Sequence, residues 1–260
     1  MAEHTTTPLR HHRLLNAGQC KILDSLYRFR FGTTDLLAGM LDMHSNRRLM
    51  QARLRLLYEQ GYIGRQYDRS YRLRGLFATY YLLPKGIAVL KQQPEIYQAR
   101  VLRNIRKDAA ASERFIVHSV RVFTAYIRLK AIYGASFVFY TRSELTDPTF
   151  DCFPEQLPDG YATYTARDGR HRHMMLECFD DTRPQRILRH RIVQLVDHEY
   201  TDGWKDNEPY PDILIVCDTD RLRQKVQHWV QTIVEDAAAE DMRLYVVTLG
   251  RLTEKAGAVT

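Results

Sequence analysis

The sequence predicts a protein of the mixed α/β (α+β) class, with a helical N-terminal part and a C-terminal part built around a mixed β-sheet. Apolar residues recur at helical spacing in three segments before residue 61, whereas short apolar strands alternate with helices after residue 135. Charge is also unevenly distributed. Residues 1–92 contain 15 Lys and Arg against 6 Asp and Glu, a net charge of +9, whereas the remainder contains 23 against 25, a net charge of −2. A basic part joined to a nearly neutral part is typical of a nucleic-acid reader attached to a second module.

Three helices are predicted in the first 60 residues. They span residues 18–31, a short segment through Met40, and residues 46–60. Gly32 is expected to end the first helix, Thr33 or Thr34 to cap the second, and Ser45 to cap the third. Gly61 stands at the usual position for a helix stop after the third.

A β-hairpin and a short helix follow. Residues 62–66 and 76–83 have the pattern of strands, and residues 84–90 that of a final short helix. Three helices and then a hairpin is the order of a winged helix-turn-helix domain, which we place at residues 14–92. The segment resembles winged-helix regulators whose third helix ends in a Leu-x-x-Leu…Gly-Tyr-Ile step into the wing.

The third helix contains the candidate base-contacting residues. On a helix of 3.6 residues per turn, one face carries His44, Arg47, Arg48, Gln51 and Arg55. The opposite side carries Leu49, Ala52, Leu56 and Leu57, which we expect to pack. Arginine can bind guanine O6 and N7, and glutamine can bind adenine. Arg47, Arg48 and Gln51 are therefore the base-contact candidates, and Asn46 can reach a phosphate or a base edge.

The hairpin tip is rich in arginine. Its candidate phosphate contacts are Arg65, Arg69, Arg72 and Arg74. Arginines that neutralise phosphates release counterions, so this wing is expected to contribute affinity and salt dependence more than sequence preference. The predicted ligand is double-stranded DNA. The alternative is a protein-binding adaptor, because winged helices also serve as protein-interaction modules.

A helical connector is predicted at residues 93–134. It contains a polar helix from Pro94 to Ala111 and a longer helix from Ser112 to Gly134. Winged helices often read paired half-sites as dimers, and these helices can supply a two-fold interface. A homodimer is therefore expected.

The C-terminal domain is predicted at residues 135–252. After the long helix the elements follow the order βββαβαβ. Strands are expected at residues 136–140, 160–166, 173–179, 212–217 and 243–249, and helices at residues 184–200 and 220–239. A mixed sheet flanked by helices is the usual product of this order.

Two acidic residues in this domain stand in the pattern of a nuclease. Leu157-Pro158-Asp159-Gly160 precedes one strand, and Met175-Leu176-Glu177-Cys178-Phe179 ends the next. This pattern resembles the PD-(D/E)xK nuclease fold, in which an Asp and a Glu hold Mg²⁺ and a Lys two residues after the Glu orients water. Phe179 occupies the lysine position here, so the resemblance implies a degenerate site without established catalytic activity.

The combination of a winged helix, a helical connector and this acidic pattern resembles the replication-relaxation family of plasmid and mobile-element proteins. The family usually continues as Glu-x-Asp followed by Gly or Thr, and here Asp180 and Thr182 are displaced by one position. The resemblance implies a DNA-binding protein acting in replication, relaxation, mobilisation or transcriptional control. A relaxase or a replication initiator is the candidate protein partner.

The rival interpretation is a Mg²⁺-dependent endonuclease that uses Asp159 and Glu177, with Arg186 or Arg189 from the next helix in place of the lysine. No cofactor is expected. The four cysteines lie far apart without a CxxC pair, so neither a disulfide framework nor a thiolate zinc site is indicated. No apolar run reaches the roughly 18 residues that a membrane span requires. The expected location is the cytoplasm.

Overall fold

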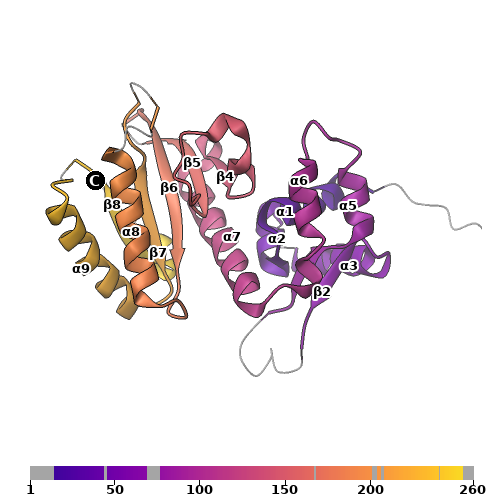
Figure 1. Ribbon diagram of the computed structural model, residues 1–260. Coiled ribbons are helices and arrows are strands. Elements are labelled where there is room, and N and C mark those ends of the chain that lie inside the picture. Colours follow the sequence, from indigo (N-terminus) through magenta and orange to yellow (C-terminus); the bar gives the residue numbers. More distant parts are fainter. Residues whose placement is uncertain are drawn as a thin grey trace, which may run out of the picture.

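The computed structural model of the 260-residue chain describes residues 15–43, 46–68, 77–166, 168–200, 204–205, 208–239 and 241–253. It is a mixed structure of helices and two β-sheets, which confirms the predicted α/β class (Figure 1). None of the described helices is long and apolar enough to cross a membrane.

The first part of the chain, called here the N-terminal unit, covers residues 15–90. Its helices are α1 (Ala17–Phe29), α2 (Thr34–Met40), α3 (Arg47–Glu59) and α5 (Pro84–Leu90). Its antiparallel sheet has the strand order β1 (Gly32–Thr33), β3 (Thr79–Leu82) and β2 (Ile63–Gln66). In the hairpin, Ile63 pairs with Leu82 and Gln66 with Thr79. The predicted sequence of three helices, a hairpin and a short helix is therefore present.

Helix ends in this unit follow the capping chemistry, although two of them differ from prediction. Thr33 caps α2 as expected, with its hydroxyl accepting the Leu36 N–H. Asn46 caps α3 in place of Ser45, which lies outside the described residues. Helix α1 ends at Phe29, because Arg30 takes a positive φ of 69° that leaves the helical path. Gly32 is therefore not the stop; it begins β1.

The single polar helix predicted at residues 94–111 is wrong. The structure instead has α6 (Ala99–Ile105) and the 3₁₀ turn η1 (Asp108–Ala110). Asp108 is buried at this break, and its Oδ2 accepts a hydrogen bond of 2.8 Å from Arg30 Nε. A buried carboxylate needs such a partner, and this ion pair ties the 3₁₀ turn to the end of α1.

Helix α7 (Glu113–Tyr133) joins the two parts of the molecule, and Ser112 caps it as predicted. Its Phe123 ring stacks on Phe29 of α1 with centroids 4.1 Å apart. One turn further, Tyr126 lies 5.3 Å from the ring of Phe139 in the large sheet. Buried residues of the N-terminal unit, α7 and one face of the large sheet therefore form one continuous apolar core.

The large sheet has five strands in chain order. They are β4 (Val138–Thr141), β5 (Gly160–Thr165), β6 (His171–Phe179), β7 (Asp212–Cys217) and β8 (Leu244–Thr248). The pairs β4–β5 and β5–β6 are antiparallel, and β6–β7 and β7–β8 are parallel. The parallel connections run through α8 (Gln185–Tyr200) and α9 (Asp220–Asp236). This agrees with the predicted order of strands and helices.

The two faces of the large sheet are covered by different elements. Helices α8 and α9 lie on one face, and α7 with the N-terminal unit lies on the other (Figure 1). Alternate residues of β6 belong to different cores, as strand geometry requires. Met174 and Leu176 pack toward α7, whereas Met175 and Phe179 pack beneath α8 and α9.

Candidate functional site

Helix α3 is held in place by a narrow buried face. Met50, Leu54 and Leu57 are fully buried, at positions i, i+4 and i+7. Arg53 extends this face, because its guanidinium donates to Met43 Sδ at 3.0 Å. It also covers Gly18 of α1, where an added Cβ would lie 2.6 Å from the guanidinium. Packing against α2 and β2, with Arg53 against α1, therefore fixes which side of α3 remains open.

The expected packing face of α3 is largely wrong. Leu57 is buried as predicted, but Leu49 is 41% exposed, Leu56 is 38% exposed and Ala52 is also exposed. The sequence could not decide this, because α3 carries apolar residues on two faces. The i, i+4, i+7 set that starts at Met50 packs, and the set that starts at Leu49 does not.

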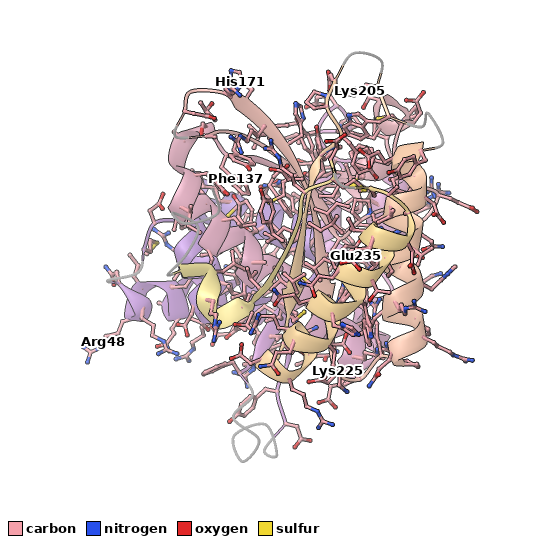
Figure 2. All side chains as sticks on the ribbon, turned by 90° about the vertical axis from the view of Figure 1, so that its left-hand side faces the viewer. Arg48, Phe137, His171, Lys205, Lys225 and Glu235 are labelled. Carbon is pink, nitrogen blue, oxygen red and sulfur yellow. The ribbon has the colours of Figure 1, made fainter. Side chains whose placement is uncertain are left out.

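The polar face of α3 is exposed as predicted. Arg47, Arg48, Gln51 and Arg55 are all exposed, and Arg48 projects away from the body of the protein (Figure 2). Asn46 also caps the helix, because its Oδ1 accepts the Leu49 N–H at 3.3 Å. His44 lies outside the described residues.

Neighbouring side chains orient the arginines on this surface. Arg65 of β2 lies over the rings of Tyr58 and Tyr67, at 5.6 and 5.5 Å from their centroids. Arg47 Nε is 3.2 Å from Asp35, and Arg55 Nε is 2.7 Å from Glu59. Exposed ion pairs contribute little stability, so an incoming phosphate or base edge can replace these carboxylates at small cost. Arg69, Arg72 and Arg74 lie outside the described residues.

A hollow of about 400 Å³ lies between α2, α3 and the hairpin. Cationic, amide and aromatic side chains line it, among them Arg47, Gln51, Arg55, Arg65, Phe77 and Tyr80. Phe77 is 63% exposed. A concave surface with arginines at its rim and rings in its wall can hold an anionic chain that also carries planar bases.

Asp159, the first acidic candidate, is buried directly before β5. Its Oδ2 accepts the Cys178 N–H at 2.9 Å, and its Oδ1 lies 2.9 Å from His118 Nε2 and 3.2 Å from the Arg142 guanidinium. Burial alone raises the pKa of a carboxyl group. Here the hydrogen bond from His118, the charges of His118 and Arg142, and the Cys178 N–H together lower the pKa of Asp159 to about 2.

Glu177, the second candidate, is buried on β6 against α8. Its Oε1 accepts a hydrogen bond of 2.9 Å from Arg191 Nε. Burial raises the pKa of Glu177, and the nearby Asp159 charge adds to this, while Arg191 opposes it. Arg186 and Arg189, the suggested replacements for the lysine, are exposed instead. The basic residue beside Glu177 is therefore Arg191.

Phe179 is 1% exposed and packs in the apolar core beneath α8 and α9. A cation is thus absent from this position on β6. The nearby ends of β6 and β7 carry a further charged group, in which Arg121 of α7 pairs with Asp218 and lies 3.6 Å from Asp180. This group was not predicted from the sequence. The signal for it was Arg121, a charged residue on the buried side of α7.

Mg²⁺ does not fit the donors around Asp159 and Glu177. Arg191 already neutralises one carboxylate, and His118 and Arg142 contact the other. Across the described parts of the chain, no group of three or more His, Cys, Asp or Glu is placed to hold a metal ion. His118, Arg142 and Arg191 were also missed from sequence, because their pairing depends on how α7, the turn after β4 and α8 pack around the sheet.

The sequence pattern that defines the replication-relaxation family matches residues 23–197. This chain belongs to the replication-relaxation family. The match begins within α1 and ends within α8, so it contains the N-terminal unit, α7, Asp159, Glu177 and Arg191. It stops before β7. No match was found among curated proteins, and none among solved structures.

In this member of the replication-relaxation family, the α3 surface and the Asp159–Glu177 region differ in chemistry. The α3 surface is exposed, cationic and hollowed, whereas the Asp159–Glu177 region is buried and its carboxylates are already paired. The α3 surface is therefore the one that a large ligand can reach.

Proposed function

We propose that this member of the replication-relaxation family binds double-stranded DNA in the replication, relaxation, mobilisation or transcriptional control of a plasmid or mobile element. The N-terminal unit acts as a winged helix-turn-helix, with α3 in the major groove and the β2–β3 hairpin as its wing. The observation that carries this proposal is the exposed face of α3, on which Arg47, Arg48, Gln51 and Arg55 stand beside Arg65 of the hairpin.

The connectivity and the charge support the same proposal. The order α1, β1, α2, α3, β2, β3, with β3 between β1 and β2, is the arrangement of winged-helix domains. The net charge of +9 on residues 1–92 attracts a polyanion at long range. Membership of the family supports the link to plasmids or mobile elements.

The test is quantitative binding of the full chain to a duplex selected from a random-sequence library. Arg47→Ala and Gln51→Ala should relax sequence preference and cost about 1–3 kcal/mol at the selected site. Arg65→Ala should instead weaken binding to all duplexes and reduce the salt dependence by about one counterion. Fluorescence anisotropy across a salt series measures both effects.

Arg186→Ala is the matched control, because it removes an exposed arginine from α8, on the other side of the large sheet (Figure 1). The control should bind like the wild type. If the α3 and hairpin variants bind DNA as well as Arg186→Ala does, this surface does not read DNA. The protein-binding adaptor is then the better interpretation.

We further propose that the C-terminal domain is a PD-(D/E)xK-like domain without cleavage activity, which serves as a scaffold for a relaxase, a replication initiator or a second DNA segment. Three antiparallel strands followed by α8 and the parallel β7 support the fold. Phe179 at the lysine position and Arg191 against Glu177 support the loss of activity.

The protein with Mg²⁺ or Mn²⁺ should leave supercoiled, linear and single-stranded DNA intact. Losing one electrostatic contribution of this kind typically lowers a rate about 10²–10³-fold, and here the carboxylates are also occupied. Gel assays of the wild type, Asp159→Ala and Glu177→Ala check this. Nicking by the wild type that both substitutions abolish would establish the endonuclease interpretation instead.

A further inference from the structure

An exposed apolar stripe runs along α3, formed by Leu49, Ala52 and Leu56. The side chains of Leu49 and Leu56 are 41% and 38% exposed, and Ala52 is also exposed. Spacings of three, four and seven residues place all three on one side of the helix. The buried face that begins at Met50 already anchors α3, and the stripe lies outside the buried core.

The surroundings of the stripe restrict what can cover it. Arg48 and Arg55 are exposed between the stripe and the side of α3 that carries Arg47 and Gln51. Arg55 is paired with Glu59, and Arg48 points outward from the molecule (Figure 2). A matching surface must therefore offer apolar groups opposite the stripe and hydrogen-bond acceptors or negative charge opposite the arginines. The major groove of DNA offers both, in the 5-methyl group of thymine and in guanine O6, guanine N7 and the phosphates.

We infer that Leu49, Ala52 and Leu56 contact thymine methyl groups in the major groove, and that they make thymine a determinant of the recognised sequence. This inference rests on the proposed function and specifies it. Leu49 and Leu56 are separated by about 10 Å along the helix axis, which corresponds to about three base-pair steps. The contacted thymines should therefore lie within about four consecutive base pairs.

A second copy of the chain is the competing occupant of the stripe. A two-fold contact through α3 places the same surface on both partners. Arg48 of the two copies would then approach its counterpart around a small apolar centre, where like charges repel, whereas Arg55 is already paired with Glu59. The positive rim therefore favours DNA over self-association.

Replacement of thymine by deoxyuridine tests the inference directly, because it removes only the 5-methyl group. The probe is the duplex selected with the full chain, substituted one thymine at a time. Loss of one contacted methyl should weaken wild-type binding about fourfold. As a control for general effects of methyl groups in the groove, a cytosine beside the contacted thymine is replaced by 5-methylcytosine.

Variants assign the effect to the stripe. In Leu49→Ala and Leu56→Ala, deoxyuridine at the contacted position should cause no further loss, since the methyl has lost its partner; this is a double-mutant cycle across the interface. Ile187→Ala on α8, also an exposed apolar residue, should keep the full fourfold response. Thermal melting by circular dichroism verifies that each variant is folded.

The outcomes separate this inference from the proposed function. If no duplex is selected, DNA binding itself fails. If Arg47→Ala and Gln51→Ala impair binding but deoxyuridine changes nothing at any position, DNA binding stands and the thymine contact is wrong. If Leu49→Ala and Leu56→Ala instead dissociate a dimer in sedimentation experiments and leave the deoxyuridine response intact, the stripe joins two copies and the inference is overturned.

Discussion

At the residue scale, the two acidic candidates differ through their environments. Asp159 receives hydrogen bonds or charge from His118, Arg142 and the Cys178 N–H, which hold it ionised. Glu177 has Arg191 as its partner, and burial nevertheless raises its pKa. Two residues whose sequence spacing resembles that of a metal site therefore form buried ion pairs in the structure. Such pairs constrain the packing of α7 and α8 more than they add stability.

Asp159 should contribute a specific acid dependence to stability. Its folded pKa of about 2 lies below the ordinary value of 3.8, so its contribution is present above pH 4 and is lost as the pH falls toward 2. The shift corresponds to about 2 kcal/mol. Asp159→Asn should remove that pH dependence while keeping an acceptor for the Cys178 N–H. Urea unfolding at several pH values between 4 and 2 measures it.

The control for this experiment is Asp151→Asn, which removes an exposed carboxylate from the same domain. Glu177 gives stability the opposite pH dependence, because its raised pKa favours the folded state at lower pH. Its effect falls above the range of pH 4 to 2 that is used for Asp159. If the free energy of unfolding depends equally on pH in the wild type and in Asp159→Asn, the Asp159 carboxylate gains no stability from its partners.

At the element scale, local chemistry predicted most of the helices and strands. Thr33 and Ser112 cap the helices that they were expected to cap, and Gly61 takes the positive φ of 74° that a residue after a helix often needs. The errors occurred where the chain meets distant partners. Beyond the end of α6, Asp108 pairs with Arg30, a residue 78 positions away in sequence.

Helix α3 shows why the candidate site was only partly predictable. Its arginines and Gln51 were correctly expected to be exposed, since charged side chains rarely pack. Each of its two apolar stripes contains two leucines, and the stripe that packs against α2 and β2 is the one containing Met50, Leu54 and Leu57. Local periodicity detects that a helix is amphipathic, but tertiary contacts choose between adjacent faces.

At the scale of the whole molecule, the proposed boundaries at residues 92 and 134 pass through a continuous core. Phe29 of α1 stacks on Phe123 of α7 and lies 6.2 Å from Phe139 of the large sheet. Arg28 also reaches across, with a hydrogen bond of 2.9 Å from its Nε to Glu144. The N-terminal unit is therefore attached to the large sheet through packed rings, and the two parts should move together.

This continuity predicts the behaviour of truncated chains. A fragment of residues 1–92 loses α7, which uncovers Phe29 and the ring of Phe31 that contacts Phe115. Removing the partner of one buried aromatic ring typically costs about 3–5 kcal/mol, which is comparable to the stability of a small domain. The fragment should melt without a cooperative transition and bind duplex DNA only weakly. A fragment of residues 1–134 keeps α7 and should melt cooperatively.

In the full chain, Phe123→Ala should lower the melting temperature of both parts in a single transition. Calorimetry with simultaneous circular dichroism measures these transitions, and a fragment of residues 1–92 as stable as residues 1–134 would show that the N-terminal unit folds independently of α7.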